Sequence, residues 1–199
     1  GGSVVECECH VKWKAEERLR LSCLESNIPA SAISKSFSSY KGSKSKHEVD
    51  KLIKYVQNYK EKGLQKSLYI YGPNGTQKTT LSHIIAKELL KQNVSVFYIR
   101  AMDLIVKNFA NFNPTEEHIV FMERAENSDL VIIDECFARK KHESVSDYQL
   151  VALRNFLKDR LEVREKSTIF ISNYAIEDIV KQGFDKGIYD LIKRNTRGR

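Results

Sequence analysis

The stretch LYIYGPNGTQKTTL, residues 68–81, decides how this chain folds. It begins with apolar and aromatic residues that favour a strand, passes through a glycine-containing turn, and continues into a predicted helix. Gly72, Gly75, Lys78 and Thr79 match the pattern of a phosphate-binding loop, in which backbone N–H groups and a helix N-terminus face an anion. We therefore expect this loop to bind the phosphates of a nucleotide.

The residue types of the loop indicate separate roles. Lys78 supplies a positive charge for the β- and γ-phosphates, and the Thr79 hydroxyl suits a Mg²⁺ ion, with Thr80 as the weaker metal candidate. The predicted nucleotide-binding residues are Gly72, Pro73, Asn74, Gly75, Thr76, Gln77, Lys78, Thr79 and Thr80.

Gln77 stands where the phosphate-loop pattern has glycine. If the backbone at this position needs a positive φ, a residue with a side chain costs roughly 1–2 kcal/mol there. Such a cost weakens nucleotide binding by about tenfold without abolishing it. The residues alone leave open whether the loop supports efficient hydrolysis.

Apolar runs alternate with helical patterns in the rest of the chain. This alternation indicates an α/β fold in which a parallel sheet is covered by helices on both faces. The predicted strands are residues 67–71, 94–100, 129–135 and 167–173. The predicted helices are residues 47–62, 78–92, 101–127 and 147–163, followed by mixed helix and loop in residues 176–199.

Polar residues end the third and fourth predicted strands, at the sheet edge where open α/β sheets bind ligands. We expect Asp134 to hold Mg²⁺, directly or through water, and Glu135 to orient and polarise the attacking water. Asn173 is placed to hydrogen-bond the γ-phosphate or that water. Glu135, Asn173 and Lys78 are thus the predicted catalytic residues. A small-molecule kinase fits less well, because these side chains suit activation of water.

Composition limits the class of protein. A chain of 199 residues, 41% hydrophobic and 30% charged, has room for one domain with a short extension. No apolar run approaches the roughly 20 residues of a membrane span, so we expect no membrane partner. The net charge of +7 arises from 33 basic and 26 acidic residues spread along the chain, which mildly favours polyanionic partners.

The N-terminal region is polar and contains three of the four cysteines. We interpret residues 1–45 as an extension that ends in a Ser/Lys-rich connector, and residues 46–199 as the main domain, cut short at its C-terminus. Gly1-Gly2-Ser3 is typical of a cloning remnant, so we expect the natural N-terminus further upstream.

The cysteines indicate a reducing, cytoplasmic setting without a disulfide framework. A structural zinc site takes four ligands. We interpret Cys7 and Cys9 as the second half of a zinc knuckle whose first half is missing, and expect free thiols more than bound Zn²⁺ in this chain.

The three motifs, in this order, resemble an AAA+ ATPase, and more narrowly the DnaC/DnaI helicase-loader and IstB-like group in its phage or mobile-element versions. The resemblance covers roughly residues 28–194. It rests on Asn27-Ile28-Pro29, on KSLYIYGPNGTQKTTL (residues 66–81), on LVIIDE (residues 130–135), and on ISN (residues 171–173) as sensor 1.

The resemblance implies a three-layer P-loop AAA+ domain with a five-stranded parallel sheet between helices and little or no lid domain. It also implies ATP, ADP and Mg²⁺ as cofactors, and a homo-oligomer that handles a replicative helicase on single-stranded DNA. Family members carry an arginine finger late in the chain, where this sequence has Asp190-Leu191; Lys193 and Arg194 are the displaced candidates.

Two departures from the family pattern, at Gln77 and Leu191, bear on hydrolysis. The sequence therefore favours a helicase-loader ATPase but leaves two alternatives open. One is an IstB-like transposition helper on duplex DNA, and the other is a nucleotide-gated helicase-binding module with weak hydrolysis. Lys107 and residues 139–142 are candidate phosphate contacts for DNA, although exposed charges of this kind need no function.

Overall fold

A sheet of four parallel strands forms the centre of the computed structural model, which describes residues 7–60, 67–109, 114–137 and 146–196. The strands are β1 (Leu68–Tyr71), β2 (Val96–Arg100), β3 (Leu130–Cys136) and β4 (Ser167–Ser172), in the order β1-β4-β3-β2. The predicted parallel sheet is confirmed. The implied fifth strand is not found in the described ranges, whose four strands are the four apolar runs of the sequence.

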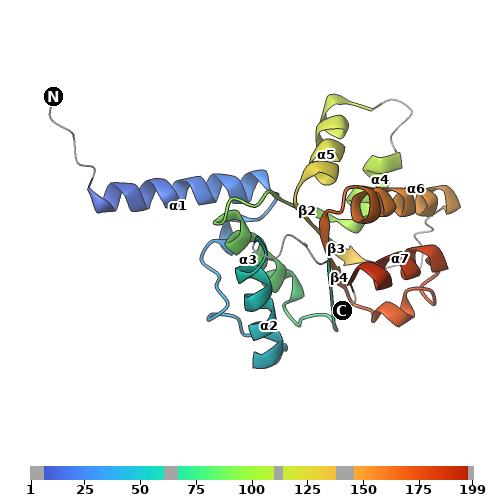
Figure 1. Cartoon of the computed structure of the whole chain (residues 1–199), viewed down its shortest axis with the longest axis horizontal. Helices are drawn as coiled ribbons and strands as arrows, with labels where there is room; N and C mark the ends of the chain where they lie inside the picture. The colour runs from blue at the N-terminus through green and yellow to red at the C-terminus, as the bar shows by residue number, and fades with distance from the viewer. Residues whose placement is uncertain (1–6, 61–66, 110–113, 138–145, 197–199) are drawn as a thin grey trace.

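Helices cover both faces of this sheet (Figure 1), as the sequence predicted. Helices α1, α2 and α3 lie on one side and α4 to α7 on the other. Their bounds are α1 (Glu8–Glu25), α2 (Lys46–Gln57), α3 (Lys78–Leu90), α4 (Ala101–Phe109), α5 (Glu116–Asn127), α6 (Asp147–Lys158) and α7 (Lys186–Thr196). Short helical turns are η1 (Ala30–Ala32), η3 (Asp159–Val163, a π-helical turn) and η4 (Ile176–Asp178).

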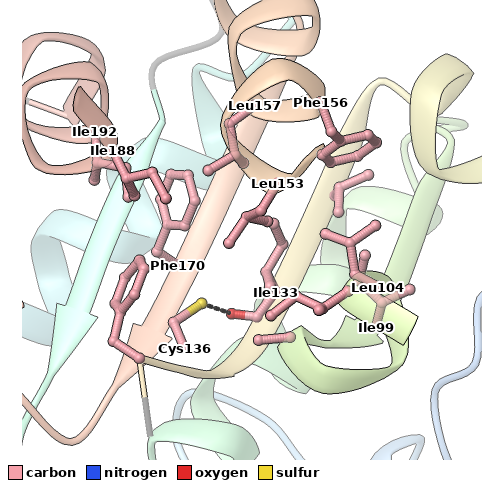
Figure 2. Packing of buried hydrophobic residues seen from close by; sticks show 14 of the residues in the cluster. Ile99, Leu104, Ile133, Cys136, Leu153, Phe156, Leu157, Phe170, Ile188 and Ile192 are labelled. Atoms are coloured by element: carbon pink, nitrogen blue, oxygen red, sulfur yellow. Dashed lines mark hydrogen bonds between the residues drawn. The ribbon is translucent and has the colours of Figure 1, made fainter. Parts of the chain in front are cut away.

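Alternation along the strands divides the core into two clusters, because successive side chains point to opposite faces of a sheet. Ile133 and Phe170 face α4, α6 and α7 and contact the apolar residues of those helices (Figure 2). Ile132 and Ile169 face α3 on the other side. The sheet is therefore buried on both faces, as its near-continuous apolar strands predicted.

Residues before α2 contribute to the cluster on the α3 side. Cys23, Ile28 and Ala32 are all buried there. The buried ammonium of Lys87, on α3, donates to the backbone oxygens of Ile33 and Lys35. The connector expected from the Ser/Lys-rich composition is therefore packed against the main domain in its first part, while the domain boundary at residue 45 stays a prediction.

Several helices differ from their predicted bounds. Helix α3 ends at Leu90, before the predicted residue 92, and α6 ends at Lys158 and continues to Val163 as the π-helical turn η3. The expected helix over residues 101–127 is divided into α4 and α5, because Pro114 lacks a backbone N–H and Thr115 caps α5 by accepting from the N–H of His118. Helix α2 ends at Gln57, earlier than the predicted residue 62, with Asn58 as its C-cap.

Helix α1 was not predicted, and it extends away from the sheet (Figure 1). At its start, Cys7 and Cys9 form a disulfide, with their Cα atoms 5.4 Å apart. This separation lies within the range that a disulfide spans. The expectation of free thiols or zinc ligands at these two positions was therefore wrong. Cys23 and Cys136 are free and buried.

Candidate nucleotide-binding site

A cavity of about 310 Å³ lies at the carboxyl ends of the strands, where β1 meets α3. Ligand pockets commonly have volumes of roughly 300–1,000 Å³. Most of the residues predicted for phosphate, metal and water line it together. The lining residues are Asn74, Gly75, Gln77, Lys78, Thr79, Asp134, Glu135, Ile171, Ser172 and Asn173.

The loop before α3 takes the backbone conformation that its pattern requires. Gly75 has φ 78° and Gln77 has φ 59°, both in the left-handed region. Gln77 therefore has the positive φ that makes a side chain costly at this position, where glycine is favoured. Gly75 has open space where a Cβ would lie, so positive φ is the reason for glycine there.

The N-terminus of α3 is open to an anion. Ser45, Thr115 and Ser146 cap α2, α5 and α6 by accepting from first-turn backbone N–H groups. Gln77, at the equivalent position of α3, makes no such side-chain hydrogen bond. The first N–H groups of this 13-residue helix are thus left for another acceptor, which is the arrangement that binds phosphate at helix N-termini.

The ammonium of Lys78 lies inside the loop. Its Nζ donates to the backbone oxygens of Gly72 and Pro73 at 2.7 and 2.8 Å, and lies 3.4 Å from Oγ1 of Thr76. Burial lowers the pKa of Lys78, an effect that the carboxylate of Asp134 opposes. Among the described residues its hydrogen-bond partners are neutral oxygens, so this buried cation favours an approaching anion.

The two predicted metal residues contact each other directly. Oγ1 of Thr79 donates to Oδ2 of Asp134 at 2.7 Å, so the loop and the end of β3 meet. Oδ1 of Asp134 accepts from the backbone N–H of Glu135 at 2.7 Å, and the Asp134 side chain is buried. Thr80 does not line the cavity, which agrees with its weaker candidacy.

The chain turns sharply after Asp134. Glu135 has φ 55° and Phe137 has φ 63°, and the pairing of β3 with β4 changes register between Ile133 and Cys136. Residues held in this region cost of order 1–3 kcal/mol each and are common at active sites. Glu135 is exposed at the cavity, and exposed Asn173 faces it from the end of β4.

Sequence reasoning missed two tyrosines at this site. The hydroxyl of Tyr98, on β2, donates to Oδ2 of Asp134 at 2.5 Å. The hydroxyl of Tyr40, from the N-terminal region, donates to the backbone oxygen of Thr76 at 3.2 Å. The alternation of β2 was the available signal for Tyr98, since it puts that residue on the α3 side, but the pairing of β2 with β3 was not predicted.

The candidates for the arginine finger lie away from the cavity. Leu191 is buried in the core, while Arg194 is exposed and pairs with Glu162 at 2.7 Å. Nζ of Lys193 lies over the ring of Tyr189. A finger acts on a neighbouring subunit, so both positions stay predictions.

The candidate DNA contacts are only partly described. Lys107 pairs with Glu117 at 3.0 Å and lies over the Phe121 ring at 4.6 Å, so its charge is engaged within the chain. Residues 139–142 lie outside the described ranges. Within those ranges, the helices include none of the length and apolar character that a membrane span requires.

The donor set fits a nucleotide with Mg²⁺. Lys78 and the uncapped end of α3 suit phosphate oxygens, whereas the hydroxyl of Thr79 and the carboxylate of Asp134 are the oxygen ligands that Mg²⁺ prefers. A zinc site is not supported: the described residues contain no group of three or more His, Cys, Asp or Glu side chains arranged to hold a metal.

Several solved structures share this fold. The DnaC helicase loader is 18% identical, with a TM-score of 0.67 over 81% of this chain and 93% of that one. DnaI is 18% identical, with a TM-score of 0.66 over 85% and 92%. DnaA bound to AMPPCP and single-stranded DNA is 17% identical, with a TM-score of 0.61 over 81% and 48%. At these identities they show the fold alone.

No curated protein matches this sequence. The profile of the ATPase family associated with various cellular activities (AAA) matches residues 68–182, which is more than half of the chain. This range includes every residue that lines the cavity. The chain belongs to the AAA family of ATPases.

Proposed function

We propose that this protein is an ATP-dependent loader of a replicative helicase, which assembles with copies of itself and acts with single-stranded DNA in the cytoplasm. The observation that carries the ATPase part is the single cavity shared by Lys78, Thr79, Asp134, Glu135 and Asn173. The loader part is supported by the fold shared with DnaC and DnaI, which extends beyond the AAA match into the N-terminal region.

The proposed chemistry assigns each side chain a step in ATP hydrolysis. The ammonium of Lys78 leaves the loop carbonyls and binds phosphate oxygens. Thr79 and Asp134 would supply the oxygen ligands for Mg²⁺. Mg²⁺, when bound, neutralises charge that develops on the phosphates. Glu135 accepts a hydrogen bond from the attacking water, and the amide of Asn173 orients that water or a γ-phosphate oxygen.

A nucleotide-gated binding module is the second candidate function. The left-handed backbone at Gln77 and the buried Leu191 at the expected finger position both disfavour rapid hydrolysis. Such a module would bind ATP and grip its helicase without useful turnover. Both candidate functions use the same cavity, so the rate of ATP hydrolysis distinguishes them.

DNA preference tests the proposed role. Fluorescence anisotropy would compare a labelled single strand with the duplex of the same sequence, each in the presence of ADP or a non-hydrolysable ATP analogue. We expect the single strand to bind more tightly than the duplex, and the ATP analogue to strengthen this binding by about tenfold. Raising the salt concentration should weaken it steeply, because phosphate contacts release counterions.

The alternatives predict different results. A preference for duplex DNA would contradict the loader proposal and favour an IstB-like helper of transposition. Equal binding with ADP and the ATP analogue would contradict nucleotide control. Lys78→Ala is the control variant, because it removes the phosphate-binding charge and should abolish the difference between the two nucleotides.

A further inference from the structure

The hydroxyl of Tyr98 reaches the buried carboxylate of the metal site. It donates to Oδ2 of Asp134, the same oxygen that accepts from Thr79. Asp134 is 4% exposed, so these protein groups, together with the N–H of Glu135, set the direction of its two oxygens.

Tyr98 is itself held from several sides. The imidazole of His83, on α3, packs edge-on against its ring, with centroids 4.8 Å apart. The backbone N–H of Tyr98 donates to the oxygen of Ser26 at 2.9 Å, and its oxygen accepts from Nδ2 of Asn27 at 3.2 Å. These contacts use the edge of β2 that faces away from β3. The Asn27-Ile28-Pro29 turn thus anchors β2 at Tyr98.

We propose that Tyr98 is a positioning residue for the metal site, which orients Asp134 so that Asp134 and Thr79 bind Mg²⁺ together with the nucleotide. The inference rests on the nucleotide-and-metal site of the proposed function and adds a residue that the phosphate-loop and strand-end motifs do not include. Tyr98 acts through Asp134 and does not touch the metal.

The physical basis is the rotational freedom of a carboxylate. Without the Tyr98 hydroxyl, Oδ2 loses one of its two side-chain donors among the described residues, and the Asp134 side chain is held less firmly in the metal-binding direction. Removing such an outer partner typically lowers metal affinity about 10- to 100-fold. Phosphate binding depends on Lys78 and the end of α3, so metal-free nucleotide binding is expected to remain.

The test is direct measurement of metal binding by the full chain. Mn²⁺ stands in for Mg²⁺, and the loss of its free-ion electron paramagnetic resonance signal is followed with protein in excess over ADP and compared with the same ADP without protein. The variants are Tyr98→Phe, which keeps the ring, and Tyr69→Phe as the matched control. Tyr69 lies on β1 and donates its hydroxyl to the backbone oxygen of Tyr174 at 2.9 Å, away from Asp134. Calorimetry with EDTA measures ADP binding without metal.

We expect Tyr98→Phe to raise the Kd for Mn²⁺ by about tenfold, while Tyr69→Phe and metal-free ADP binding stay within about twofold of the wild type. Unchanged or tighter Mn²⁺ binding in Tyr98→Phe would overturn the proposal. An equal loss of metal-free ADP binding would also overturn it, because Tyr98 would then support the whole site and not the metal residues. A wild-type chain that binds no ADP would instead contradict the proposed function itself.

Discussion

Thr79 and Asp134 are 55 positions apart in the chain, yet Oγ1 of Thr79 donates to Oδ2 of Asp134 at 2.7 Å. This hydrogen bond joins the phosphate-binding loop to the end of β3. The loop and the acidic strand end therefore form one site in the folded chain.

Loss of the Thr79 hydroxyl should weaken metal-dependent nucleotide binding. Thr79→Val keeps the shape of the side chain but removes the metal ligand and the hydrogen bond to Asp134. We expect ATP affinity in Mg²⁺ to fall by at least about tenfold. Thr80→Val is the matched control, since Thr80 does not line the cavity. Isothermal calorimetry measures both, and an equal loss in the two variants would contradict the assignment of Thr79.

Glycine at position 77 should stabilise the fold. The left-handed backbone at Gln77 costs roughly 1–2 kcal/mol, and glycine avoids this cost. The greater entropy of glycine in the unfolded chain offsets about 0.5–1 kcal/mol of that gain. We expect Gln77→Gly to raise the free energy of unfolding by about 0.5–1 kcal/mol in urea denaturation. Gln77→Ala keeps the unfavourable backbone and should bring no gain. A Gly variant no more stable than the Ala variant would show that the conformation carries no cost.

Several parts of this structure could be predicted from sequence, because each depends on local chemistry. The glycine-containing turn, the acidic end of β3 and the amide at Asn173 each follow an apolar run, and parallel strands bring their carboxyl ends to one edge. Neither the order of the strands nor the geometry of the cavity was needed to name those residues.

The rest depends on contacts between distant segments. Tyr98 reaches Asp134 because β2 pairs with β3, with Arg100 opposite Asp134, and sequence gave no indication of that pairing. Helix α1 has no apolar stripe for periodicity to detect, since most of its residues are exposed. The composition of residues 34–46 is typical of a connector, although Tyr40 within it contacts the phosphate-binding loop.

The burial of Arg160 also depends on contacts between distant segments. Its place in a charged stretch of sequence predicts exposure, but the structure buries it fully. Its guanidinium donates to Thr168 and to backbone oxygens at the end of α5 and the starts of β3 and β4. Burial lowers the pKa of Arg160 to about 10, so it stays charged at neutral pH.

Replacing Arg160 should therefore destabilise the fold strongly. Arg160→Lys keeps the charge but cannot supply the planar set of donors, which leaves buried carbonyls unpaired. We expect a loss of roughly 3 kcal/mol in urea denaturation. Arg164→Lys, at a more exposed arginine that pairs with Asp159, should cost less than about 1 kcal/mol. Similar losses in the two variants would contradict this account of Arg160.

A mixing experiment tests whether Arg194 acts on a neighbouring subunit. Arg194 is exposed, with 65% of its side chain accessible, and its removal leaves the cavity of its own chain intact. We expect Arg194→Ala to bind ATP normally but to release little phosphate. Adding the inactive Glu135→Gln chain should restore release, because its Arg194 completes the site of the other subunit. Lys193→Ala serves as the control, and no recovery on mixing would exclude Arg194 as the finger.

We expect the cavity to hydrolyse ATP in response to DNA. The most direct measurement is phosphate release from ATP, with and without single-stranded DNA, by the wild-type chain and by Glu135→Gln. We predict release that single-stranded DNA stimulates and that disappears in the variant, while ATP binding is retained in both. Release no greater in the wild type than in Glu135→Gln, with ATP still bound, would contradict hydrolysis and identify a nucleotide-gated binding module.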